Sequence, residues 1–213
     1  MTDMTPAAEK PALLFDLGGV IMDIQRENCV ASMRRLGMEH PEQFLGDYGQ
    51  KGPFLALEKG EISPEEFHAQ LKPYLREGVT DAEIDAAFND FLVGIPVERL
   101  RHLEALHRDH HIYMLSNTNK IMWDSKIAEE FRKDGHDRDY YFDGCVASFD
   151  VKSYKPDAAI FEETLRRFGL QAGDVIFFDD SKANCEAAAK LGFKTIWVAP
   201  GKEFYQLLPE TEE

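Results

Sequence analysis

The sequence lacks the features of a membrane or secreted protein. It contains no apolar run approaching the ~20 residues that a membrane-spanning helix requires. Residues 1–10 are polar and lack the basic and apolar regions of a signal peptide. The three cysteines, Cys29, Cys145 and Cys185, are widely spaced and form no Cys-x-x-Cys motif, which favours reduced thiols over a disulfide framework or a zinc site. We therefore expect a cytoplasmic protein with no membrane partner and with disordered tails at residues 1–10 and 209–213.

Positive charge is also scarce. The chain of 213 residues has 24 Lys and Arg against 39 Asp and Glu, a net charge of −15. A protein this acidic is repelled by nucleic acid and by anionic membrane surfaces, so we expect neither as a partner. A small anionic ligand is still compatible with this charge, provided that a metal ion and a local lysine reverse the sign at the site.

Short apolar segments bounded by glycine or polar residues predict buried strands. Amphipathic helical stretches separate the later ones, and this alternation predicts a parallel sheet with right-handed crossovers. The fold class that follows is α/β, a Rossmann-like core of three layers. The predicted strands are Ala12–Phe15, Ile112–Leu115, Cys145–Ala147, Val175–Phe178 and Thr195–Val198.

The stretch between the first two predicted strands differs from the rest. It carries helical periodicity, with capping-box patterns that begin at Ser63 and Thr80, and it offers no convincing strand. Because it is too long for one crossover helix, it predicts an inserted domain. We expect an α/β core from residues 11–22 and 96–200 and a smaller helical domain from residues 23–95.

Polar side chains of chemical interest follow three of the predicted strands. In a parallel sheet these strand ends share one edge, where open α/β sheets bind ligands. Lys155 opens the helix after another strand and can face the same edge. The groups at the three strand ends are Asp16, Ser116 with Asn117, and Asp179 with Asp180.

This set contains the parts for phosphoryl transfer through a covalent aspartyl intermediate. Asp16 can attack phosphorus, and acids at two strand ends can hold Mg²⁺ through oxygen ligands. Ser116, Asn117 and Lys155 can hold phosphate oxygens. Taken alone, each feature is equally explained as a turn, a helix cap or an exposed helix start. The coincidence of all of them at strand ends and a helix start favours a catalytic site.

On these motifs the chain resembles the haloacid dehalogenase-like hydrolase superfamily. The resemblance implies Asp16 as the nucleophile and a helical cap of the C1 type over a Rossmann-like core. Among family members, the pattern is similar to that of bacterial sugar-1-phosphate phosphatases such as α-D-glucose-1-phosphatases. The matching segments are Phe15–Ile21, Leu115–Thr118, Tyr154–Asp157, and Phe178–Ser181 together with Asn184.

The resemblance also implies a Mg²⁺ site. The metal would lie against Asp16, Asp180 and the Gly18 carbonyl, and Asp179 or Asn184 would hold its water shell. Ser116 and Lys155 would bind the phosphate.

One position departs from the family pattern. The residue two after the nucleophile is usually a second Asp that protonates the leaving oxygen, whereas this chain has Gly18. General acid–base catalysis is typically worth about 10²–10⁴-fold. Three outcomes stay open: a substrate with a better leaving group, such as a sugar 1-phosphate; replacement by Asp23 or by a cap residue; or binding of a phosphorylated ligand without turnover.

The turn that contains Glu58 and Lys59 joins two helical pieces of the insert and is our candidate for substrate specificity, together with Asp23. A solvated turn is the alternative. We expect a Mg²⁺-dependent phosphatase for a small phosphorylated metabolite such as a sugar phosphate, acting as a monomer or homodimer. The alternatives are a catalytically weak phospho-ligand binder and a metal-independent 2-haloacid dehalogenase, against which the acidic pair at 179–180 argues.

Overall fold

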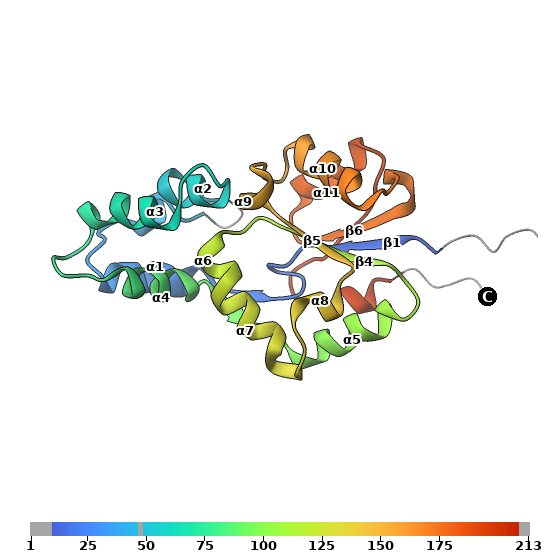
Figure 1. Cartoon of the computed structure of the whole chain (residues 1–213), viewed down its shortest axis with the longest axis horizontal. Coiled ribbons are helices and arrows are strands. Elements are labelled where there is room, and N and C mark those ends of the chain that lie inside the picture. Colours follow the sequence, from blue (N-terminus) through green and yellow to red (C-terminus); the bar gives the residue numbers. More distant parts are fainter. Residues whose placement is uncertain (1–9, 47–48, 209–213) are drawn as a thin grey trace, which may run out of the picture.

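A parallel sheet of five strands forms the centre of the structure, a computed structural model that describes residues 10–46 and 49–208 (Figure 1). The strand order is β5-β4-β1-β6-β7, and every neighbouring pair is parallel, so the predicted α/β class is confirmed. Apart from Lys10, the predicted disordered tails lie outside the described residues. The strands are β1 (Ala12–Phe15), β4 (Ile112–Ser116), β5 (Gly144–Ala147), β6 (Val175–Asp179) and β7 (Lys194–Trp197).

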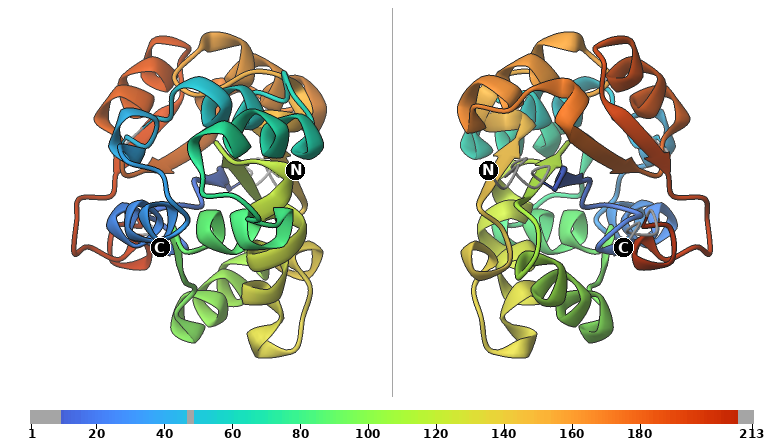
Figure 2. Two further views of the ribbon diagram at one scale, coloured as in Figure 1. Left: turned by 90° about the vertical axis from the view of Figure 1, so that its left-hand side faces the viewer. Right: turned by 90° about the vertical axis from the view of Figure 1, so that its right-hand side faces the viewer.

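Two helical layers cover the sheet, as the end-on views of Figure 2 make clear. Because successive strand residues point to opposite faces, Leu14 packs in one apolar cluster and Phe15 in another. Helices α10 and α11 lie over the first face, and α5 and α8 over the second (Figure 1). Their bounds are α5 (Val97–His107), α8 (Arg138–Tyr141), α10 (Ala158–Phe168) and α11 (Lys182–Lys190).

The inserted segment forms a helical cap that extends away from the sheet (Figure 1). Its interior is aromatic: Phe54 makes edge-to-face contacts with Phe67 and Phe88, whose rings stack on one another. Both predicted capping boxes are present, at Ser63 and Thr80. The cap helices are α1 (Arg26–Arg35), α2 (Gly52–Glu58), α3 (Pro64–Leu71) and α4 (Asp81–Asn89).

A short antiparallel pair joins the two ends of the cap, where the sequence predicted no strand. Strand β2 (Asp23–Ile24) pairs with β3 (Leu92–Gly94). Segments of two and three residues are too short to produce an alternating pattern, which explains why the prediction was wrong here. The domain boundaries at residues 22/23 and 95/96 stay a prediction.

The remaining helices are short and flank the sheet edge. In the described parts of the chain, none of the helices combines the length and apolar character needed to cross a membrane. A π-helical segment, Trp123–Ile127, separates two of them. Their bounds are α6 (Lys120–Met122), α7 (Ala128–Phe131) and α9 (Ser148–Val151).

Candidate active site

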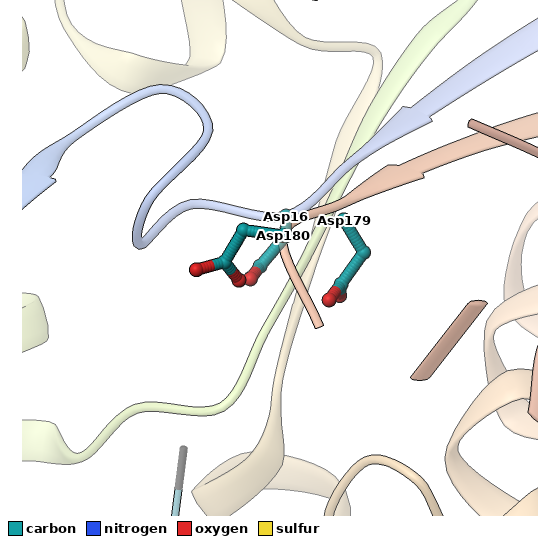
Figure 3. Close-up of side chains that lie close together, drawn as sticks. All are labelled: Asp16, Asp179 and Asp180. Carbon is teal, nitrogen blue, oxygen red and sulfur yellow. The ribbon is translucent and has the colours of Figure 1, made fainter. Parts of the chain in front are cut away.

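Residues at the carboxyl ends of three neighbouring strands line one small pocket. Strand β1 lies between β4 and β6, and the Asp16 amide continues the pairing by donating to the Phe178 carbonyl at 2.8 Å. Asp16 therefore stands beside the end of β6, and Ser116, at the end of β4, lines the same cavity of about 100 Å³. Figure 3 shows the carboxylates of Asp16, Asp179 and Asp180 just beyond the ends of β1 and β6.

The Lys155 ammonium is the centre of the charge arrangement. It is 2% exposed, and its Nζ lies 2.7 Å from Asp16 Oδ1, 2.8 Å from Asp179 Oδ2 and 3.1 Å from the Leu115 carbonyl oxygen. Burial alone would lower the pKa of Lys155, but the charges of Asp16 and Asp179 outweigh it, so its pKa is raised. Three contacts use the three donors of an ammonium group, which fixes the side chain in place.

The carboxylates outnumber this lysine. Burial, opposed by Lys155 and reinforced by the other two acids, raises the pKa of Asp16 to about 7. Burial and the Asp179 charge raise the pKa of Asp180 to about 6. Carboxylate oxygens of all three acids lie within 4.8 Å of one another. One lysine leaves two negative charges uncompensated, and a divalent cation that prefers oxygen ligands fits this deficit.

The two glycines that follow Asp16 differ in how closely their backbone approaches the carboxylate cluster. Gly19 has a φ of +74°, and a Cβ there would lie 2.4 Å from Asp180 Oδ2, so the backbone at Gly19 can approach the carboxylate only because it has no side chain. Gly18, which lines the pocket, has ordinary backbone angles, and its Cβ would lie 3.5 Å from Ile24 Cγ2, an ordinary contact. Sterics therefore require glycine at Gly19 and not at Gly18.

Asp179 acts as a structural anchor in this arrangement. Its side chain is fully buried, and Oδ1 accepts the Ser181 amide at 2.8 Å and Asn184 Nδ2 at 3.0 Å. Asn184 is the residue that the sequence paired with Asp179 around the metal. The structure brings the two into direct contact, so Asp179 connects Lys155 to the start of α11 (Lys182–Lys190).

Asn117 lies at the pocket, but its side-chain amide is already engaged. Nδ2 donates to the Lys155 carbonyl at 3.0 Å, and Oδ1 accepts the Lys155 amide at 2.8 Å. The side chain thereby fastens the loop after β4 to the segment that carries the lysine. Ser116, by contrast, is buried at the end of β4 with its residue lining the cavity.

The cap contributes one acid to the pocket, Glu58 at the end of α2. Its side chain is buried, and Oε2 has no hydrogen-bond partner. Burial, only partly opposed by a hydrogen bond from Tyr154, raises the pKa of Glu58 to about 8. The Ser148 hydroxyl donates to the Glu58 carbonyl at 2.6 Å and accepts the Thr118 amide at 3.0 Å, which ties α2 to the loop after β4.

The other two acid and base candidates of the cap lie elsewhere. The Asp23 carboxylate pairs with Arg99 at 2.7 Å and does not line the pocket. Lys59 faces a separate surface groove that Glu61 and Lys152 also line. Asp23 and Lys59 therefore do not line the pocket, because a buried arginine from α5 holds the first and the turn after α2 directs the second outward. Their part in substrate specificity stays a prediction.

Tyr154 and Ser148 are among the residues of the site that the sequence did not predict. Tyr154 directly precedes Lys155 in the Tyr154–Asp157 motif. This adjacency was the signal that Tyr154 lies at the carboxyl edge of the sheet. Ser148 offered no such signal, because its contact with Glu58 spans 90 positions of the chain.

Comparisons with known proteins agree with this geometry. A family model described as haloacid dehalogenase-like hydrolase matches residues 10–192. D-ribitol-5-phosphate phosphatase of Bacteroides thetaiotaomicron is 30% identical over 196 residues, covering 92% of this chain and 95% of the relative. Sesquiterpene phosphatase astK of Aspergillus oryzae is 28% identical over 194 residues, covering 85% of this chain and 86% of the relative.

Solved structures give the same relationship. A family enzyme from Bacteroides thetaiotaomicron, bt-2542, was solved as a point mutant in complex with magnesium and inorganic phosphate. It superposes on this chain with a TM-score of 0.90 at 33% identity, covering 94% of this chain and 100% of the solved one.

Proposed function

Because the chain belongs to the haloacid dehalogenase-like hydrolases and is a phosphoric monoester hydrolase with Mg²⁺ as its cofactor, we propose that it hydrolyses a small sugar phosphate or sugar-alcohol phosphate through an aspartyl-phosphate on Asp16. The observation that carries the proposal is the cluster of three carboxylates around one buried lysine at the carboxyl edge of the sheet. The related D-ribitol-5-phosphate phosphatase supports the substrate class.

Mg²⁺ would be held by Asp16, Asp180 and the Gly18 carbonyl, with Asp179 or Asn184 around its water shell. When bound, it offsets the negative charge of the acids and of the phosphate. Its ligands in this arrangement are oxygen atoms, as a hard cation requires.

The attacking group is one oxygen of Asp16. Oδ1 accepts the Leu17 amide at 2.7 Å and contacts Lys155 Nζ at 2.7 Å. Since both contacts fall on Oδ1, they fix the carboxylate and support attack on phosphorus by Oδ2. Ser116 would hold a phosphate oxygen, and Lys155 would do so by exchanging one of its three ammonium contacts for the phosphate. Asn117 positions Lys155 through its two hydrogen bonds to the Lys155 backbone.

The rest of the substrate would lie toward the cap. The pocket combines apolar side chains, among them Phe88 and Met122, with the polar groups of Glu58 and Tyr154. Such a lining suits a short carbon chain that carries hydroxyl groups, and the volume of about 100 Å³ favours a small one. Of the three specificity candidates, Glu58 is the one in a position to contact it.

The test is phosphate release from a panel of sugar phosphates, sugar-alcohol phosphates and an aryl phosphate, measured with Mg²⁺ and with a chelator. We expect release that requires Mg²⁺, is lost in Asp16→Asn and is strongly weakened in Asp180→Asn. Asp174→Asn, at an exposed acid before β6, serves as the matched control and retains activity. Turnover that survives Asp16→Asn would remove the nucleophile from its role, and ligand binding without release would favour the phospho-ligand binder.

A further inference from the structure

Glu58 combines three properties that the core of the site does not explain. It is 5% exposed, it lines the pocket that contains Asp16, and its Oε2 has no partner among the described residues. A buried, unpaired carboxyl oxygen is costly, because the group has lost its hydration without gaining a hydrogen bond. Such a group is retained where a ligand completes its hydrogen bonding.

Glu58 lines the pocket of Asp16 from the cap, which is the side that the geometry of phosphoryl transfer favours for the leaving group. The attacking and leaving oxygens lie roughly in line through phosphorus. Asp16 attacks from the sheet edge, so the leaving oxygen points away from the sheet. Glu58 comes from α2 of the cap, which Ser148 fastens to the loop after β4. The backbone that carries the Glu58 side chain is thus fixed to the core.

We propose that Glu58 is the general acid and base of the reaction, in the role that an aspartate at position 18 would otherwise fill; this rests on the proposed function. In the first step Asp16 Oδ2 forms a bond to phosphorus, the bond from phosphorus to the leaving oxygen breaks, and the Glu58 proton passes to that oxygen. In the second step Glu58 carboxylate takes a proton from water, the water oxygen bonds to phosphorus, and the bond to Asp16 breaks. Phosphate leaves, and both side chains return to their starting states.

The electrostatic surroundings suit this assignment. Burial raises the pKa of Glu58 to about 8, so the group carries its proton at neutral pH. Among the described residues, Tyr154 and, from α1, Cys29 interact with Glu58, and Asp16, Lys155 and Asp180 line the same pocket. Burial raises the pKa of the Cys29 thiol to about 12 and raises the pKa of Tyr154 further above its ordinary value. Both therefore stay neutral in the range where Glu58 exchanges its proton.

The test compares leaving groups in the first turnover, with substrate in excess over the protein. An alkyl phosphate needs a proton on its leaving oxygen, whereas 4-nitrophenyl phosphate releases a stable anion. We expect Glu58→Gln to slow release of the alcohol from the best alkyl phosphate of the panel by about 10²–10⁴-fold. Release of the first equivalent of nitrophenol changes by less than about tenfold, and it appears as a burst because the water step then lacks its base.

Matched variants separate this role from others. Glu61→Gln changes an exposed acid three positions further on and should leave both substrates unaffected. Glu58→Asp keeps a carboxyl group, so it should release the alkyl alcohol faster than Glu58→Gln. Thermal unfolding and binding of inorganic phosphate with Mg²⁺ establish that each variant is folded.

Two results would overturn the proposal. Equal slowing of both substrates by Glu58→Gln would assign the residue to binding or structure, and unchanged alkyl release would leave it without a role in proton transfer. Neither result touches the nucleophile, whose failure would appear separately as turnover in Asp16→Asn.

Discussion

On the core side of the pocket, the Asp16 and Asp179 carboxylates contact Lys155 Nζ at 2.7 and 2.8 Å. On the cap side, the Glu58 carboxyl group is just as buried but has no cationic partner among the described residues, and its Oε2 has no hydrogen bond. Among the described residues, the same chemical group is thus paired with a buried cation in one half and left without one in the other.

The difference shows how carboxyl groups in one pocket can perform two different chemical tasks. Charged acids near a lysine attract a divalent cation and provide a nucleophile, for which ionisation is needed. A neutral acid in an apolar wall can donate a proton, which an ionised one cannot do. In our proposal, the core therefore sets where attack occurs, and the cap determines which leaving groups can depart.

Removing the lysine should have the largest effect on the difference between the core half and the cap half. Lys155→Met leaves Asp16 and Asp179 buried without their cation. Breaking a buried ion pair by removing one partner costs about 3–5 kcal/mol, so we expect a loss of this size in the free energy of unfolding with a chelator present. Phosphatase activity should also become undetectable, because the nucleophile is no longer held.

Urea denaturation measures the effect. Lys152→Met, at an exposed position three residues earlier, is the control and should change little. An unchanged unfolding free energy in Lys155→Met would contradict the idea that this lysine compensates the core half.

The second prediction concerns pH and the cap half. The pKa of Glu58 is raised from 4.5 to about 8, so the folded protein holds a proton that the unfolded chain releases. The stabilisation that this gives is present below about pH 4.5 and is lost as pH rises toward 8. Glu58→Gln cannot ionise, so relative to wild type it should gain stability with rising pH, by at most about 1.4 kcal/mol per pH unit.

Urea denaturation of both proteins between pH 5 and pH 8, at intervals of about one unit, checks this. Glu61→Gln should follow the wild-type curve throughout. A constant difference between Glu58→Gln and wild type would mean that Glu58 is ionised in the folded state.

The sequence predicted the core half of the pocket more completely than the cap half. Asp16 and Asp179 each follow a short apolar run, and parallel strand ends meet at one edge, so local patterns were enough to bring them together. The helix starts at Ser63 and Thr80 were predictable for the same reason, since a capping box is a signal of four residues.

The cap half depends on contacts between distant segments. Arg99 draws Asp23 away from the pocket, although the two are 76 positions apart, and Ser148 fixes Glu58 across 90 positions. Neither pairing leaves a periodic trace in the sequence. The pairing of β2 (Asp23–Ile24) with β3 (Leu92–Gly94) was missed because strands this short show no alternation.

The third prediction loosens the contact that fastens the cap half to the core half. Ser148→Ala removes the hydroxyl between the Glu58 carbonyl and the Thr118 amide, which are both buried. Leaving buried polar groups unsatisfied costs about 1–3 kcal/mol, so stability should fall by this amount. Alkyl phosphate turnover should fall more than aryl phosphate turnover, because Glu58 moves while Asp16 stays in place.

Thermal unfolding and steady-state kinetics with the two substrates measure the two effects. Ser153→Ala, in the loop before Lys155, is a control that leaves this contact intact. A uniform loss with both substrates would mean that the contact supports the whole pocket instead of the cap half.

The smallest structural effect is expected where a carboxyl group is moved from the cap to the core. Gly18 has ordinary backbone angles and an ordinary contact at the Cβ position, so Gly18→Asp should change the unfolding free energy by less than about 1 kcal/mol. In the Glu58→Gln background, this aspartate supplies the missing proton donor and should raise the rate of alcohol release at least about tenfold.

Gly19→Asp is the matched control. Its Cβ would lie 2.4 Å from Asp180 Oδ2, so this substitution cannot restore activity. If Gly18→Asp folds normally and binds Mg²⁺ yet leaves alcohol release unchanged, the lost function of Glu58 was not proton transfer. The difference between a lysine-paired core half and an unpaired cap half would then have no catalytic meaning.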